Sequence, residues 1–328
     1  MKLGTLNTAG KLDGELIVVS RDLTTAVKAT HIAPNLRQAV ENWADTASQL
    51  EALYASLNAG EAADSFPFDE NTVHSPMPRS FSWLDGSAYI QHVKLVRKAR
   101  NAPLPEGLMT DPLMYQGGSD TYLTPKGDIP HIDQSHGVDF EGEVAVITDQ
   151  VPMGTKTDDA GQHILLVMLV NDVSLRGLIP SELKKGFGFL VGKPSSAFSP
   201  VAVTPDELGE HWRDCKVHLN LDVTYNDEFY GNADAGAMHF SFAELLSHIT
   251  QTRSLSAGTI MGSGTVSNED TSRGSSCLAE KRMLEKIETG EFHTPFMAPG
   301  DTIRIEMKDP DGNSIFGSID QKVVKANL

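Results

Sequence analysis

One short stretch of the chain alternates between apolar and polar residues. From Val138 to Val146 every second residue is apolar or glycine, which is typical of a β-strand with two unlike faces. The other face carries Glu141 and Glu143, whose Cα atoms would lie roughly 6.5 to 7 Å apart. Two carboxylates this close repel unless water screens them or a cation neutralises them. The stretch therefore predicts either a strand with one solvated face or two ligands of a hard divalent cation.

Other stretches give equally clear periodic signals. Residues 164–170 form an unbroken apolar run, which indicates a strand buried on both faces. Apolar residues at three- and four-residue spacing predict a helix that begins at Pro34 and ends at Gly60. Further elements are expected as a hairpin over 217–228, helices over 240–252 and 276–287, and two final strands over 302–307 and 314–319.

Composition along the chain indicates a small part and a large part. Residues 1 to about 30 predict short strands, and the helix described above follows them. Between residues 58 and 82 the chain is rich in Gly, Pro, Ala, Ser, Asp and Asn, which is typical of an irregular connection. We therefore expect a small N-terminal α/β unit with its linker over residues 1–75 and a larger domain over residues 76–328.

The overall composition is that of a globular protein with a strong negative charge. Of the 328 residues, 40% are hydrophobic and 22% are charged, with 44 acidic against 27 basic side chains and a net charge of −17. This charge repels phosphate backbones and anionic membrane surfaces, so neither nucleic acid nor a membrane is an expected partner. The N-terminus lacks the pattern of a signal peptide, and the longest apolar run is too short to span a bilayer.

Cysteine usage bears on the compartment and on the kind of metal site. Only Cys215 and Cys277 occur, far apart and in no C-x-x-C pattern. A disulfide framework and a thiolate metal site are therefore not expected. Such sparse cysteine usage fits a reducing cytoplasm, which is the location we expect.

Several polar residues stand where a site would be supported, although each has a structural explanation when taken alone. Asp172 follows the buried run, where an aspartate either caps the next element or holds a ligand. Asp85 precedes a glycine and suits a turn, and His92 suits a satisfied core histidine. Lys193 is either exposed at a turn or paired with an anion. Glu280 falls in the first turn of an expected helix, where it complements the helix dipole.

Together these residues form an ordered pattern. It comprises Asp85 and His92, Glu141-x-Glu143, Asn171-Asp172-x-Ser174-x-Arg176, Gly192-Lys193, Ser263-Gly264-Thr265 and Glu280. The acidic pair, followed about thirty residues later by N-D-x-S-x-R, is the specific part of the pattern. From about residue 83 to its C-terminus the chain resembles the fumarylacetoacetase (fumarylacetoacetate hydrolase) family. The resemblance implies an α+β, β-rich fold in which a mixed β-roll catalytic domain carries a small N-terminal unit, often as a homodimer.

The resemblance also implies a metal site. Four carboxylates match the ligands of one Mg²⁺ or Ca²⁺ ion in that family, namely Asp85, Glu141, Glu143 and Asp172. Asp139 would share a face with the two glutamates but has no counterpart among the ligands, so it is not expected in the site.

The catalytic residues follow from the same resemblance. His92 matches the histidine that activates water, and Glu280 matches the glutamate that orients it. The cations that stabilise an oxyanion correspond to Arg176 and Lys193, and the residues that line the substrate correspond to Tyr115 and Thr265. Tyr115 is expected in a tight glycine turn. The family glutamine three residues after the arginine is replaced by Ile179, which removes one polar contact.

The implied activity is hydrolysis of a carbon–carbon bond in a small anionic β-diketo acid. Fumarylacetoacetate, cleaved to fumarate and acetoacetate in the catabolism of tyrosine and other aromatic compounds, is the first expectation. Acylpyruvate or fumarylpyruvate hydrolysis, and decarboxylation or isomerisation of an oxo acid, remain open within the family. A catalytically silent metal-binding dimer is a further alternative. A metal-dependent phosphoesterase is disfavoured, because the sequence shows no phosphate-binding loop or arginine cluster.

Overall fold

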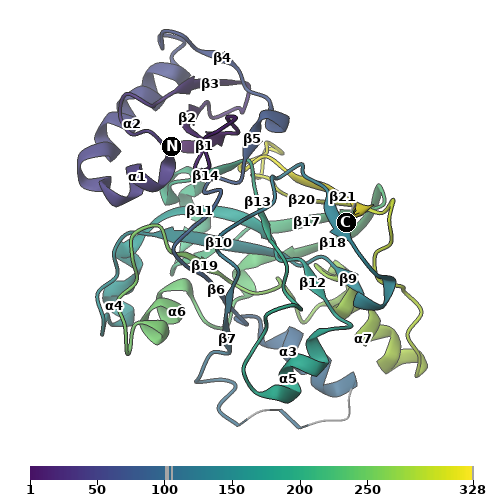
Figure 1. The fold of residues 1–328 in the computed structure, drawn as a ribbon. Helices are drawn as coiled ribbons and strands as arrows, with labels where there is room; N and C mark the ends of the chain where they lie inside the picture. The colour runs from purple at the N-terminus through teal and green to yellow at the C-terminus, as the bar shows by residue number, and fades with distance from the viewer. Residues whose placement is uncertain (100–102, 105, 327–328) are drawn as a thin grey trace.

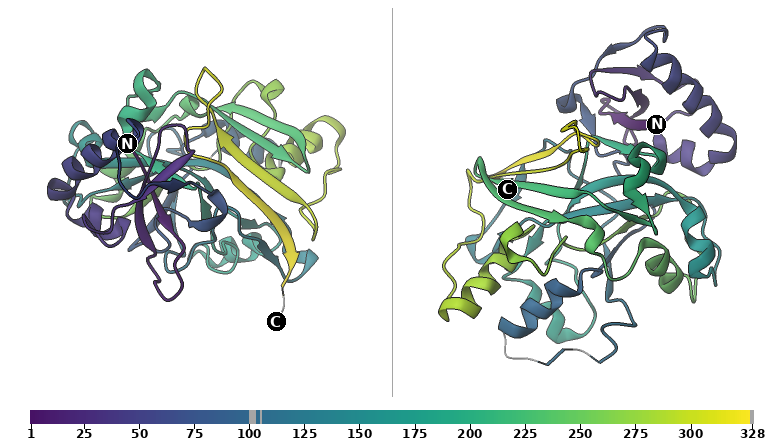
Figure 2. Two further views of the ribbon diagram at one scale, coloured as in Figure 1. Left: turned by 90° about the horizontal axis from the view of Figure 1, so that it is seen from above. Right: turned by 180° about the vertical axis from the view of Figure 1, so that it is seen from behind.

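Two large β-sheets pack against each other at the centre of the protein, and helices surround them (Figure 1). The structure is a computed structural model that describes residues 1–99, 103–104 and 106–326. Figures 1 and 2 show the N-terminal unit at one end of the molecule and the helices α3 (Ile90–Ala99), α5 (Ile179–Lys185) and α7 (Leu278–Thr289) at the other.

The larger sheet contains twelve strands in the described part of the chain. Ten of them run in the order β4 (Phe66–Pro67), β3 (Thr25–Lys28), β2 (Glu15–Val19), β1 (Lys2–Leu6), β14 (Val201–Val203), β11 (Ile164–Asn171), β10 (Gly142–Thr148), β19 (Ile260–Gly262), β6 (Trp83–Gly86) and β7 (Met114–Gly117). The other two are β5 (Val73–His74), which pairs with β1, and β13 (Ala197–Phe198), which pairs with β11. Strands β19 and β6 run parallel to each other, whereas the adjacent pairs β10–β19 and β6–β7 are antiparallel.

The second sheet has five strands, in the order β18 (Glu228–Asp234), β17 (Asn220–Tyr225), β20 (Thr302–Met307), β21 (Ile319–Lys325) and β8 (Ile129–His131). Two short ladders complete the described strands: β9 (Val138–Asp139) with β12 (Ser174–Leu175), and β15 (Trp212–Arg213) with β16 (Lys216–Val217).

The remaining helices are short, apart from one in the N-terminal unit. The α-helices are α1 (Leu36–Glu41), α2 (Trp43–Asn58), α4 (Thr157–Ala160) and α6 (Phe242–Ile249). The 3₁₀ helices are η1 (Glu70–Thr72), η2 (Gln134–His136), η3 (Gly161–His163), η4 (Pro205–His211), η5 (Ala235–Ala237) and η6 (Thr271–Arg273).

Strand β11 lies at the centre of the core, as its unbroken apolar sequence predicts. Its alternate side chains enter two different clusters, because successive residues of a strand point to opposite faces. Val167 and Leu169 pack in one cluster with Leu221 of the second sheet. Leu166 and Met168 pack in the other, which also contains residues of the N-terminal helices. Every residue of β11 is buried, so the expectation of a strand covered on both faces is confirmed.

The N-terminal strands continue the larger sheet. Strand β1 pairs antiparallel with both β2 and β14, so residues near the N-terminus lie beside a strand from the middle of the chain. The expected single helix is two helices, since Asn42 leaves the helical conformation between α1 and α2. Thr46 Oγ1 donates to the Ala39 carbonyl oxygen at 2.8 Å and so satisfies a group at the end of α1. The division of the chain at residues 75 and 76 stays a prediction.

Local patterns predict the hairpin and the later helices correctly. Asn226 and Asp227 have positive φ angles of 52° and 62° between β17 and β18, as a two-residue hairpin turn requires. Helices α6 and α7 lie where helical periodicity places them.

Three local expectations are wrong. The last strand begins at Ile319 instead of Ser314, because the loop after β20 closes with an isolated bridge between Lys308 and Ser314. Tyr115 lies in strand β7 and not in a turn. The acidic strand is interrupted between Asp139 and Gly142, so that β9 pairs with β12 while β10 pairs with β11 and β19.

Gly264 lies where the segment after β19 closely approaches β6, and a substitution there tests this approach. Its φ is +80°, and an added Cβ would lie 2.1 Å from the carbonyl oxygen of Gly86. We expect Gly264→Ala to lower the free energy of unfolding by about 3 kcal/mol or more, because backbone strain and a backbone clash add. Gly10 has a similar φ of +79° in open space, so Gly10→Ala should cost only about 1 kcal/mol. Urea unfolding of both variants measures the difference, and equal losses would contradict the close approach.

Candidate active site

Three buried carboxylates meet near the ends of strands β6, β10 and β11 of the larger sheet. Asp85 belongs to β6, Glu143 to β10, and Asp172 follows β11. One oxygen of each lies within 4.8 Å of the others. Their exposed fractions are 6%, 0% and 0%. Burial, reinforced by the neighbouring negative charges, raises the pKa of Asp85 and of Glu143 well above the usual range.

Glu143 shows that this group suits a cation. Both of its carboxylate oxygens are buried, and neither has a hydrogen-bond partner in the described structure. A buried carboxylate without a partner costs several kcal/mol, so native proteins pair such groups or use them as ligands. Carboxylate oxygens are the donors that hard divalent cations prefer. The residues present therefore fit such an ion.

Glu141 has other partners. It lies in the break between β9 and β10, where it forms an isolated bridge with Cys277. Its Oε1 accepts hydrogen bonds from the Arg176 guanidinium at 2.6 Å and from Thr265 Oγ1 at 2.8 Å. Lys193 Nζ donates to its Oε2 at 2.5 Å. Although burial alone would raise the pKa of Glu141, Arg176 and Lys193 hold it well below the usual range. Its predicted role as a metal ligand stays a prediction.

Both glutamates are nevertheless inside the protein. Glu141 is 5% exposed and Glu143 is 0% exposed, so the alternative of a solvated acidic face is wrong. The predicted strand is present as β10, but its polar face is directed to the interior of the protein and not to water.

Lys193 is paired and not exposed. Its ammonium nitrogen lies 2.5 Å from Glu141 Oε2 and 2.5 Å from Asp172 Oδ2. Burial would lower the pKa of Lys193, but the charges of Asp172 and Glu141 raise it, so the side chain is a permanent cation. Tyr115 lies beside it, with its ring centroid 5.1 Å from the ammonium and its hydroxyl donating to Asp172 Oδ2 at 2.5 Å. The structure thus brings Tyr115, Lys193 and Asp172 together.

Asp139 is a member of the site that the sequence interpretation left out. It is fully buried, and its Oδ2 accepts from Arg176 Nε at 2.8 Å. Its oxygens also accept from the backbone N–H groups of Leu278 at 2.7 Å and Ala279 at 3.0 Å. One carboxylate therefore holds Arg176 and the first turn of α7, the helix that carries Glu280. The signal in the sequence was its position on the same face as the two glutamates.

A second group forms where α3 packs against α7. Ligand atoms of His92, Cys277 and Glu280 lie within 4.8 Å of one another. Glu280 Oε1 accepts from Ser267 Oγ, whereas Glu280 Oε2 and His92 Nδ1 are buried without a partner in the described structure. The structure thus brings together the two residues that the sequence assigns to water activation, and adds a cysteine that it did not.

Burial sets the charge of this pair. Desolvation lowers the pKa of His92 to about 4 and raises the pKa of Glu280 to about 7. At neutral pH the imidazole is therefore uncharged and has a lone pair that can accept a proton.

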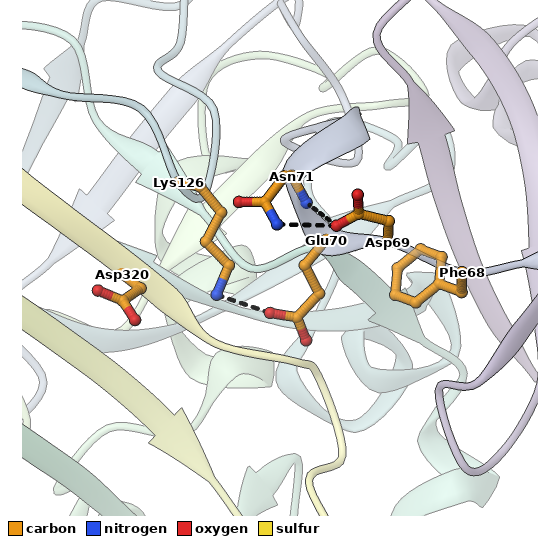
Figure 3. A pocket seen from close by; sticks show the side chains of 6 residues that line it. All are labelled: Phe68, Asp69, Glu70, Asn71, Lys126 and Asp320. Carbon is orange, nitrogen blue, oxygen red and sulfur yellow. Dashed lines mark hydrogen bonds and ion pairs between the residues drawn. The ribbon is translucent and has the colours of Figure 1, made fainter.

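A surface pocket of about 520 Å³ lies between the N-terminal unit and the second sheet, and no residue of the two groups lines it. Its lining residues are Phe68, Asp69, Glu70, Asn71, Lys126 and Asp320 (Figure 3). Lys126 Nζ lies 2.6 Å from Glu70 Oε2, and Asn71 donates to Asp69. Because these groups form hydrogen bonds and ion pairs with one another, we interpret the pocket as a gap where two parts of the fold meet and not as a binding site.

No helix among the residues that the structure describes has both the length and the apolarity needed to cross a bilayer.

The bridging role of Asp139 can be tested with a nearly isosteric change. In Asp139→Asn one oxygen becomes an amide group that cannot accept, so either Arg176 or the α7 backbone loses its acceptor. We expect a loss of about 3 kcal/mol in the free energy of unfolding. Asp149→Asn is the matched control, since Asp149 is 37% exposed and pairs with His163 near the surface, where the loss should stay below about 1 kcal/mol. Equal losses in the two variants would refute the bridging role.

Two models of known protein families match this sequence. Residues 82–324 match the family model of the fumarylacetoacetate (FAA) hydrolase C-terminal domain. Residues 1–79 match that of fumarylacetoacetase N-terminal domain 2.

Individual relatives include a tautomerase and a hydrolase. The oxaloacetate tautomerase YisK of Bacillus subtilis (strain 168) is 27% identical over 209 residues, which cover 62% of this chain and 64% of that protein. The 2,4-didehydro-3-deoxy-L-rhamnonate hydrolase of Sphingomonas sp. (strain SKA58) is 31% identical over 175 residues, 50% of this chain and 55% of that protein. The matches thus span less than two thirds of these two relatives.

A solved structure shares the whole fold. Maleylpyruvate hydrolase from Sphingobium sp. SYK-6, solved with manganese(II) and pyruvate, superposes with a TM-score of 0.65 at 14% identity and covers 100% of both chains. The α+β, β-rich fold expected from the resemblance is confirmed. Because the two family models match residues 1–79 and 82–324, the chain belongs to the fumarylacetoacetate hydrolase family.

Proposed function

We propose that this protein is a metal-dependent hydrolase that cleaves a carbon–carbon bond in a small anionic β-diketo acid. The observation that carries the proposal is the pair of His92 and Glu280, each with a buried polar atom that has no partner in the described structure. Glu141 links this pair to the acidic group, because its backbone forms a bridge with Cys277 while its carboxylate binds Lys193. Two of the similar proteins are named hydrolases, which agrees with this reaction type.

His92 is the general base of the proposed reaction. Its imidazole is neutral at physiological pH and accepts a proton from the attacking water. The charge of Glu280, once ionised, stabilises the imidazolium that forms. General-base catalysis of this kind contributes typically about 10²- to 10⁴-fold to the rate.

Arg176 and Lys193 supply positive charge to a site in a strongly acidic protein. Both side chains are largely buried, where a cation interacts more strongly with an anion than it does in water. We assign them to the substrate carboxylate and to the oxyanion that forms when water attacks the carbonyl. A well-placed donor to an oxyanion contributes roughly 3 to 4 kcal/mol. We also assign Tyr115 and Thr265, which donate hydrogen bonds to Asp172 and Glu141, to substrate binding.

The metal ligands are Asp85, Glu143 and Asp172, with Glu141 as the fourth candidate, and the ion is Mg²⁺ or Ca²⁺. When bound, such an ion polarises the substrate oxygens as a Lewis acid.

Fumarylacetoacetate is the first substrate to test, with acylpyruvates and fumarylpyruvate as alternatives. The side chain of Ile179, which replaces the family glutamine, has no hydrogen-bonding group, so a substrate with less polarity on that side fits better. We further propose that the protein acts as a cytoplasmic homodimer in the catabolism of tyrosine or another aromatic compound.

Tautomerisation of an oxo acid is the second candidate function, because a similar protein is named an oxaloacetate tautomerase. Tautomerisation moves a proton within the substrate and consumes no water. The water-activating pair of His92 and Glu280 therefore favours hydrolysis.

An absorbance assay separates these functions. Hydrolysis removes the ultraviolet absorbance of the β-diketone from fumarylacetoacetate or an acylpyruvate, and a chelator should abolish that loss. Accelerated conversion of enol to keto oxaloacetate, with no cleavage of any diketo acid in the panel, would replace the proposed function with tautomerisation.

The proposed base gives a direct prediction. We expect His92→Ala to lower kcat by about 10²- to 10⁴-fold, with metal content and substrate binding largely kept. The matched control is His74→Ala, since His74 also carries a buried, unpaired Nδ1 and stands outside both groups. A His92→Ala variant that keeps nearly the wild-type rate shows that His92 is not the base.

The metal group gives a second prediction. Glu143→Gln removes a charge from a carboxylate that has no protein partner, so we expect at least a tenfold loss in affinity for Mg²⁺ or Ca²⁺ by calorimetry. Glu141→Gln tests the fourth ligand in the same measurement, and Glu70→Gln at the surface pocket is the control. Unchanged affinity in Glu143→Gln would remove this residue from the metal site, and unchanged affinity in Glu141→Gln would limit the site to three protein ligands.

A further inference from the structure

The group of His92, Cys277 and Glu280 contains one more ligand than water activation needs. Cys277 is fully buried at the N-cap of α7, and its Sγ accepts a hydrogen bond of 3.4 Å from the Glu280 backbone N–H. A serine or threonine is the usual residue at this position of a helix, so capping alone does not call for a thiol.

The three side chains lie together, and two of them carry a buried polar atom that has no hydrogen-bond partner in the described structure. Glu280 is 3% exposed, and its Oε2 has no hydrogen-bond partner in the described structure. His92 Nδ1 is likewise buried and unpaired. Unpaired buried polar atoms are rare in native proteins and indicate an additional ligand or a catalytic role. Here two such atoms and a thiol belong to one group, whose ligand atoms lie within 4.8 Å of one another.

The donor types differ from those of the acidic group. Asp85, Glu143 and Asp172 offer oxygen alone, which suits a hard cation. Sulfur, imidazole nitrogen and one carboxylate oxygen are the donors that bind Zn²⁺, usually as three protein ligands with a water in the fourth position. The protein therefore has two neighbouring groups that prefer different metals.

We propose that Cys277, His92 and Glu280 form a second metal site, selective for zinc and similar soft cations, whose occupation inhibits the enzyme. Binding forms metal–sulfur, metal–nitrogen and metal–oxygen bonds, and the protons of the thiol and the carboxyl group pass to solvent. The imidazole lone pair that binds the metal can no longer take a proton from water. Hydrolysis stops while the acidic group keeps its own cation. The inhibitory effect, unlike the binding itself, rests on the proposed role of His92.

His92 is the least buried residue of this group. It is only half-buried as a residue, whereas Cys277 and Glu280 are covered almost completely.

Cadmium absorbance tests binding without any need for turnover. The magnesium-saturated protein is titrated with Cd²⁺ while the charge-transfer band of the cadmium–thiolate bond is recorded. Wild type and Cys215→Ser should both develop the band with one equivalent, and Cys277→Ser should not. Cys215 is the matched control, since it is the only other cysteine of the chain. A band that survives in Cys277→Ser, or that is lost in Cys215→Ser, overturns the site.

Zinc inhibition tests the consequence. With Mg²⁺ in large excess, each variant is compared with its own zinc-free rate. Cys277→Ser should need at least tenfold more Zn²⁺ than wild type or Cys215→Ser for half-inhibition. Equal sensitivity, or inhibition that more Mg²⁺ relieves, would mean that zinc acts at the acidic group and would overturn the inhibitory role. Because the cadmium titration needs no substrate, it decides the site even if the proposed hydrolysis is wrong.

Discussion

Buried negative charge is the constraint on which the rest of this site depends. Five carboxylates gather in the interior near the strand ends: Asp85, Asp139, Glu141, Glu143 and Asp172. In the described structure, Arg176 and Lys193 form ion pairs with three of these carboxylates, namely Asp139, Glu141 and Asp172. The balance is negative, and Glu143 in particular has no partner. Charges that close together in a low-dielectric interior are costly, which explains why the pKa values of Asp85 and Glu143 rise and why the group suits a divalent cation.

The same charges connect the two halves of the site. Arg176 binds both Asp139 and Glu141, while Asp139 also holds the first turn of α7. The position of Glu280 therefore depends on a carboxylate that makes no contact with the proposed metal ligands except through Arg176. Lys193 connects Glu141 to Asp172 in the same manner. A change in any of these groups is expected to disturb both the acidic group and the pair of His92 and Glu280, because they share partners.

The two groups that we propose as metal sites differ in their donor atoms. The acidic group offers oxygen only, whereas the group around Cys277 offers sulfur and nitrogen as well. Under this proposal, hard cations bind the acidic group and soft cations bind the group around Cys277. The sequence argued against a thiolate site because its cysteines are not clustered. That rule applies to sites built from local cysteine motifs, whereas the site proposed here uses a single cysteine that packing brings beside a histidine and a glutamate.

The sequence by itself determined the elements whose burial is encoded locally. The apolar run of β11, the hairpin turn at Asn226 and the alternation within β10 each follow from neighbouring residues. It also predicted most of the site residues, because the spacing of carboxylates, histidine and cations along the chain resembles that of a known family. Only the tertiary structure decided how these residues meet. The break between β9 and β10 separates Glu141 from Glu143, Asp139 turns out to hold α7, and Cys277 joins His92. These contacts link distant parts of the chain, and they depend on how the sheets and helices pack, which no local period specifies.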